Sequence, residues 1–299
     1  SQSSDGYNRE RVARVFVIIG FVVVLGSVIV GYTMHGGNIA VLLQVTEFII
    51  IGGAGLGAVM IANKPSVVKR IATESLGLLK PSRYNREAYA ELLQVLYTIF
   101  YAARRDGLVG IESHIEAPEQ SELFQQFPSF YANQHARNFL TDTLKVLLTG
   151  AVEDHHLAEI LDQDIEKYHD EAMVVPNALN RIGDAMPGFG IVAAVLGVII
   201  TMGHIGGAPE QIGHSVAAAL VGTFLGILLA YGVFGPLAQA TEARARAERD
   251  YMMCIRTAIL SFSRGDPPIT SVEFARRNIE PEDRPSFAEL EEMTRKQAR

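Results

Sequence analysis

Four long runs of apolar residues interrupt an otherwise polar chain. They cover residues 15–34, 39–62, 185–204 and 212–240, and the only acidic residue within them is Glu47. Each run reaches about 20 residues, the length of helix that crosses about 30 Å of hydrocarbon. The pattern therefore predicts four transmembrane helices.

Basic residues flank these runs on one side only. Lysines and arginines stand before the first and third runs and after the second and fourth, whereas the connecting segments 35–38 and 203–211 contain none. Basic flanks stay in the cytoplasm. We therefore expect an N-terminal lead (1–14), a large domain (63–184) and a C-terminal tail (241–299) on the cytoplasmic side.

Helical periodicity continues in the polar segments. Residues 85–115 carry one apolar stripe, and residues 132–171 carry another opposite a solvated acidic face. In the tail, Ser286 and Glu289 have the spacing of a capping box that opens a short helix. Nothing has the alternation of a strand, so the predicted fold class is all-α.

Composition excludes several functions. The chain has 299 residues, 48% of them hydrophobic and 20% charged, and its net charge of −7 argues against nucleic-acid binding. The lone Cys254 cannot form an intramolecular disulfide and is expected to be buried. His155, His156 and His169 lack the spacing of a metal site, and no catalytic motif is present. We expect neither an enzyme nor a bound cofactor.

A few residues in the spans are chemically unusual. Pro187 is either a first-turn proline or a hinge, and Pro236 either stops its helix or forms a hinge. Glu47 lies about two turns from the outer loop, where it either snorkels to the interface or serves a function. The hydroxyls of Thr201 and Thr223 either bond to their own helix or line a wet path.

Small residues recur at four-residue spacing in the second, third and fourth spans. The third contains Ala193 and Gly197, and the fourth contains Gly222, Gly226 and Ala230. Such patterns predict close helix–helix contacts. With one acid near the outer edge, the spans lack a deep proton-binding group, so a partner chain is expected to supply it if the protein conducts protons.

Five segments resemble the MotA family of flagellar stator proteins. They are MPGFGIVAAVLGVIITMG (186–203), LVGTFLGILLAYGVFGPLA (220–238), VTEFIIIGGAGLGA (45–58), RRDGLVGIESHIEAPEQSELF (104–124) and RPSFAELEE (284–292). The resemblance covers nearly the whole chain after about residue 15. It implies a subunit of a pentameric ring in the bacterial inner membrane. The ring encloses two single-span MotB-like helices, whose aspartate accepts protons, and ion flow drives torque on the rotor protein FliG.

The resemblance also implies roles for individual residues. Arg104 and Glu112 match charges that face the rotor, and Pro187 and Pro236 match a pair that couples ion flow to movement. Ala194 stands where sodium-driven relatives carry threonine, which favours H⁺ over Na⁺, and Thr223 matches a threonine shared by both types. On a continuous helix, Arg104 and Glu112 would lie about 80° apart and share one broad face.

Two other functions remain open at this point. A TolQ/ExbB-like energiser of outer-membrane processes shares the two-helix core, but that family typically has three spans in a different order. A structural membrane scaffold would conduct no ions. The four predicted spans favour the stator.

Overall fold

The computed structural model describes residues 2–150 and 153–297, which form helices and connecting loops without a strand. Four of the helices are long and apolar enough to cross a membrane, as predicted. The chain divides into two compact units. We call residues 9–81 and 172–243 the spanning unit, and residues 2–8, 82–150, 153–171 and 244–297 the polar unit.

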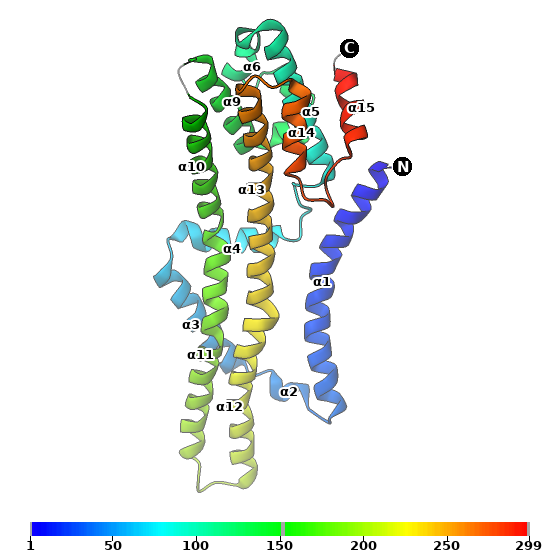
Figure 1. The fold of residues 1–299 in the computed structure, drawn as a ribbon. Helices are drawn as coiled ribbons and strands as arrows, with labels where there is room; N and C mark the ends of the chain where they lie inside the picture. Colours follow the sequence, from blue (N-terminus) through cyan, green and yellow to red (C-terminus); the bar gives the residue numbers. More distant parts are fainter. Residues whose placement is uncertain (1, 151–152, 298–299) are drawn as a thin grey trace. The chain divides into compact units, whose positions relative to one another are not determined.

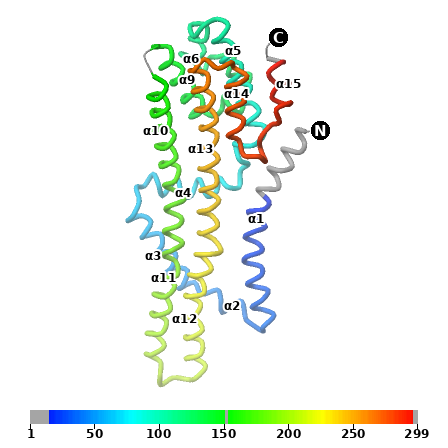
Figure 2. Tube along the Cα trace, in the orientation of Figure 1, coloured from blue at the N-terminus to red at the C-terminus, as the bar shows by residue number. Residues whose placement is uncertain are grey.

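The spanning unit is built around an antiparallel helix pair. Its elements are α1 (Gln2–Met34), α2 (Ile39–Leu42), α3 (Val45–Ala62), α4 (Pro65–Gly77), α11 (Val174–Met202), α12 (Pro209–Leu229), the π-helix η2 (Ala230–Phe234) and the start of α13 (Gly235–Ser263). Helices α11 and α12 run side by side and are joined by a short loop (Figure 1). The trace in Figure 2 follows the same hairpin. Helix α3 packs against both of its arms.

Two predicted spans differ in their boundaries. The second consists of two helices, because the chain leaves helical geometry between Leu42 and Val45. The third lies within α11, which begins at Val174 because the polar residues before the apolar run continue the helix. The predicted first span, residues 15–34, lies within the longer helix α1.

The polar unit surrounds a separate hydrophobic core. Its elements are α5 (Arg86–Asp106), the 3₁₀ helix η1 (Leu108–Ile111), α6 (Glu112–Glu116), α7 (Glu122–Gln125), α8 (Pro128–Ala132), α9 (Gln134–Leu148), α10 (Asp154–Ala172), the remainder of α13, α14 (Pro268–Arg277) and α15 (Phe287–Gln297). The predicted stripe of α5 is buried, and Phe100 stacks on Phe262 of α13 with ring centroids 4.4 Å apart. Cys254 is fully buried, as expected.

Two helices predicted as continuous are broken at glycines. The predicted helix 85–115 ends at Asp106, because Gly107 adopts a φ of 76°, and the predicted helix 132–171 is interrupted beside Gly150, with a φ of 67°. Positive φ is accessible to glycine at little cost and ends a helix. The capping box is confirmed, since the Ser286 amide donates to Glu289 and the Glu289 amide donates to the Ser286 hydroxyl.

Candidate functional site

Glycines bring α11 and α12 into backbone contact. A Cβ placed on Gly226 would lie 2.5 Å from the Met186 carbonyl oxygen, and one on Gly190 would lie 2.7 Å from the Gly222 carbonyl oxygen. One on Gly197 would lie 2.6 Å from the Ala219 Cβ. Real side chains do not fit at these distances. The close contact expected from the small-residue spacing in these two spans is thus present between them.

Glu47 lies at the centre of this contact. A Cβ placed on Gly222 would lie 2.5 Å from Glu47 Oε2, so the carboxyl occupies the space left by the missing side chain. Glu47 is only 5% exposed. Its Oε2 is buried and has no hydrogen-bond partner among the residues that the structure describes. The interpretation of Glu47 as a residue that snorkels to the interface is therefore wrong for this chain, because α12 covers the carboxyl.

Two other candidate residues adjoin the same position. The Ala194 backbone nitrogen would lie 3.3 Å from a Cβ on Gly222, and Thr223 is the next residue of α12. Both are half-buried. Glu47 and the Ala194 backbone thus meet at Gly222, whereas the Thr223 backbone faces Gly190 of α11. Thr201 lies apart from them, and its hydroxyl donates to the Gly197 carbonyl at 2.8 Å, so it bonds to its own helix.

Pro187 lies inside α11, well beyond its first turn. The interpretation as a first-turn proline fails because the helix begins at Val174. A proline in a helix interior removes one backbone hydrogen bond and permits a kink. The neighbouring Met186 carbonyl faces Gly226, so the proline adjoins the closest part of the helix pair.

Pro236 does not end the fourth span. It is the second residue of α13, which directly follows the π-helix η2 and continues to Ser263. The Gly235 amide bonds to the Ala230 carbonyl, so the wider turn closes just before the proline. Such π-bulges cause kinks and are frequent at functional sites. A Cβ on Gly183 would lie 3.3 Å from the Phe234 Cβ, so α11 contacts this bulge.

Arg104 and Glu112 are exposed residues of the polar unit, but they occupy different helices. The turn at Gly107 separates α5 from α6, so the expected 80° relation on one helix is wrong. The Arg104 guanidinium donates to the Gly265 carbonyl at 3.2 Å. This bond ties the end of α5 to the turn between α13 and α14.

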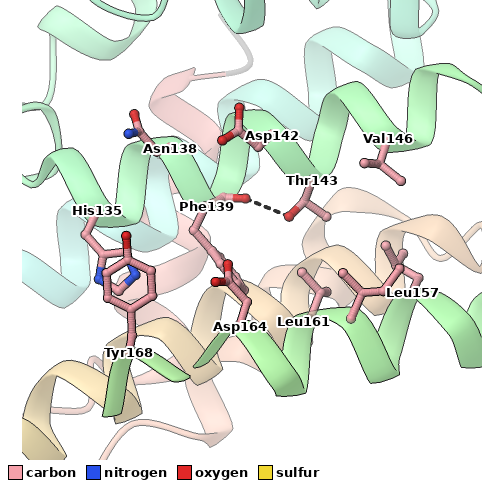
Figure 3. Close-up of a pocket in the computed structure, with 11 residues that line it drawn as sticks. His135, Asn138, Phe139, Asp142, Thr143, Val146, Leu157, Leu161, Asp164 and Tyr168 are labelled. Carbon is pink, nitrogen blue, oxygen red and sulfur yellow. Dashed lines mark hydrogen bonds between the residues drawn. The ribbon is translucent and has the colours of Figure 1, made fainter. Parts of the chain in front are cut away.

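The polar unit also contains a groove of about 290 Å³ between α9 and α10 (Figure 3). The His135 ring stacks on Tyr168 at its edge, with centroids 3.4 Å apart, and shares a hydrogen bond of 3.2 Å with Glu248. This bond lowers the pKa of Glu248. Apolar and polar side chains both line the groove, and the Thr143 hydroxyl donates to the Phe139 carbonyl of the same helix.

One cluster in the polar unit could offer metal ligands. The ligand atoms of Glu153, His155 and His156 lie within 4.8 Å of one another, and all three side chains are exposed. Solvent competes for such groups, and the described part of the chain adds no fourth ligand of the kind that a structural zinc centre has. His169, which the sequence placed near acids as well, is not part of this cluster.

Comparison with known proteins identifies the family. The motility protein A N-terminal model matches residues 18–107, and the MotA/TolQ/ExbB proton channel family model matches residues 131–253. Motility protein A of Salmonella typhimurium is 37% identical over 279 residues, covering 93% of this chain and 95% of that protein. The chain belongs to the MotA family. Chemotaxis protein LafT of Vibrio parahaemolyticus is 35% identical over 93% of the chain and 98% of its own length.

Solved structures of MotA-family complexes have the same fold. The "Structure of C. jejuni MotAB" superposes with a TM-score of 0.73 at 22% identity and covers 90% of this chain and 97% of its own. The "Structure of the flagellar MotAB stator complex from Bacillus subtilis" gives a TM-score of 0.67 at 22% identity, covering 86% and 92%. As a MotA-family protein with four apolar helices, the chain is a multi-pass protein of the inner membrane.

Proposed function

We propose that this chain is the flagellar stator subunit that, with a MotB-like single-span partner, conducts protons and converts the ion-motive force into torque. The observation that carries the proposal is the match to motility protein A along nearly the whole chain. The N-terminal match over residues 18–107 covers most of the first span and all of the second, which favours this function over that of a TolQ/ExbB-like energiser. The proposed activity is transport and mechanical work rather than catalysis.

The exposed apolar surfaces of the spanning unit support assembly with other chains. No residue of the first span, residues 15–34, is buried within the chain, and few residues of the second span, 39–62, are buried. These surfaces require lipid or other protein chains around them. We propose that copies of this chain form a pentameric ring around the membrane helices of a MotB-like partner, whose aspartate accepts protons. Both ends of the chain then lie in the cytoplasm.

The conducted ion is proposed to be H⁺. Sodium in protein sites is held by oxygen ligands, and the methyl group of Ala194 supplies none at the position where sodium-driven relatives carry threonine. Thr223 follows Gly222, which faces the Ala194 backbone, and its hydroxyl is proposed to line the path. No resident cofactor is part of the proposal.

Torque is proposed to arise from two coupled features. Pro187 and the bulge before Pro236 weaken regular hydrogen bonding in α11 and α12–α13, so these helices bend there when the ion site changes charge. Arg104 and Glu112 are proposed to contact FliG. Exposed charges of this kind orient a transient partner and add little affinity.

Complementation with flux measurement tests the function. The chain and its genomic partner are expressed in a bacterium that lacks its own stator, and swimming and proton uptake are recorded with and without Na⁺. We expect motility that survives removal of Na⁺ and is lost when the proton gradient collapses. A complex that assembles yet carries no current would refute the stator function, and dependence on Na⁺ would refute the ion assignment alone.

A further inference from the structure

The Glu47 carboxyl is the one acidic group inside the four apolar runs, and the proposed function leaves it without a role. It is 5% exposed, and its Oε2 atom lacks a hydrogen-bond partner in the described part of the chain. A buried polar atom without a partner costs free energy that an alanine or leucine would avoid. Packing alone therefore does not explain an acid here.

The surroundings of Glu47 supply no compensating charge. The facing segments are residues 185–202 of α11 and 213–229 of α12, which carry no lysine, arginine, aspartate or glutamate. Their only titratable side chain is His214, which is exposed and lies two turns from Gly222 along α12. An isolated carboxylate costs much more to bury than the neutral acid, so this site favours a bound proton.

The position of Glu47 is deep relative to the outer ends of the two helices. It lies at the level of Ala193 and Gly222. Ala193 precedes the end of α11 at Met202 by about 14 Å, and Gly222 follows the start of α12 at Pro209 by about 20 Å. The sequence places Glu47 near the outer loop, but the helix pair extends well beyond it. The carboxyl therefore lies beside Gly222 and near Ala193 and the Ala194 backbone, among apolar residues of both helices.

We propose that Glu47 is a proton-exchange residue of this chain, positioned on the conduction path ahead of the partner's proton acceptor. The carboxylate takes one H⁺ from water at the outer side and becomes a neutral carboxylic acid. It then releases that H⁺ toward the next acceptor and returns to the carboxylate, so charge and atoms balance over one cycle. This inference rests on the proposed function, since it assigns a step to the same pathway.

Because Gly222 has no side chain, the Glu47 carboxyl can approach the backbone of α12. The carboxyl lies directly against the α12 backbone, where it is held close to the helix that carries Thr223. Protonation removes the charge from the α3–α12 contact, and deprotonation restores it. Proton occupancy is thereby linked to the contact between α3 and α12.

Flux through the complete complex tests the assignment. Glu47→Gln keeps the shape and removes the titrating group, Glu47→Asp keeps an acid, and Glu210→Gln neutralises an exposed acid in the first turn of α12 as a matched control. We expect Glu47→Gln to lower proton flux by about tenfold or more, the scale of a lost positioned proton-transfer group. Glu47→Asp should retain part of the flux with a shifted pH profile, and Glu210→Gln should match the wild type.

A measurement on the unaltered complex guards against misfolded variants. Dicyclohexylcarbodiimide modifies protonated carboxyl groups in apolar surroundings, so mass spectrometry should find modified Glu47, with a yield that falls as pH rises. Normal flux in Glu47→Gln, or no modification of Glu47 at any pH in a conducting complex, would overturn the inference and leave the stator function intact. Absence of flux in the wild-type complex would instead overturn the stator function itself.

Discussion

Replacing Gly226 by alanine should separate the two central helices. The added Cβ would lie 2.5 Å from the Met186 carbonyl oxygen and 3.0 Å from the Gly190 Cα. These distances are about 1 Å and 0.5 Å inside ordinary contact. Both neighbours are backbone atoms, so no side-chain rotation relieves the overlap and α11 and α12 have to move apart.

The cost follows from this geometry. Overpacking that shifts backbone costs about 1–3 kcal/mol, and separation also weakens the contacts along the rest of the pair. Gly213→Ala is the matched control, because it lies in the same helix and its added Cβ meets nothing within 4 Å. Alanine is favoured over glycine within a helix by up to about 1 kcal/mol. The two variants should therefore move stability in opposite directions.

Thermal unfolding of the purified complex in one detergent measures the difference. We expect the unfolding midpoint of Gly226→Ala to fall by several degrees, while Gly213→Ala stays level or rises. Equal midpoints for Gly226→Ala and Gly213→Ala would refute the argument that backbone contact at Gly226 holds the helix pair together.

Three further predictions concern the polar unit. Phe100→Ala should cost about 3–5 kcal/mol by removing the ring stacked on Phe262, whereas Phe100→Leu should cost less, and thermal unfolding of the full chain compares them. The Ser286 amide and Arg86 hold the pKa of Glu289 below its ordinary 4.5. The contribution of Glu289 to folding stability is therefore present above pH 4.5 and is lost as the pH falls through the folded-state pKa. At neutral pH, hydrogen exchange should show that α15 is less stable in Glu289→Gln than in the wild type, by less than about 1 kcal/mol. This difference in stability should vanish in acid, and a difference that stays constant with pH would contradict the reasoning. Arg104→Glu should reduce torque on a tethered cell and regain part of it with an opposite charge change in the rotor, and unchanged torque would remove Arg104 from the rotor interface.

Features encoded by local pattern could be predicted from the sequence. The four spans depend on the length and apolarity of each run, and the capping box depends on two residues three positions apart. Both appear in the structure because neighbours along the chain determine them. The contact between α11 and α12 was also predictable, since four-residue spacing places small residues on one helix face.

Features that depend on tertiary contact were not predictable in this way. The sequence predicts that Glu47 lies near the outer edge, because it gives only the distance from Glu47 to the loop along the chain. The burial of Glu47 depends instead on Gly222, which belongs to another helix. Pro187 reads as a first-turn residue because the apolar run starts beside it, although the helix begins at Val174. The break at Gly107 requires a positive φ. A glycine within an amphipathic stripe permits a positive φ, but its presence alone does not predict one.

The first span has a consequence for how the protein fits its membrane. Along residues 15–34, none of α1 is buried within the chain. Substitution of one apolar residue by another there therefore changes few contacts inside the subunit. The property under constraint is instead the length of the apolar stretch relative to bilayer thickness. In a thicker or thinner bilayer this helix has to tilt or deform the surrounding lipid, at fractions of a kcal/mol per Å of mismatch. Membrane thickness thus becomes a variable to which this subunit responds through α1.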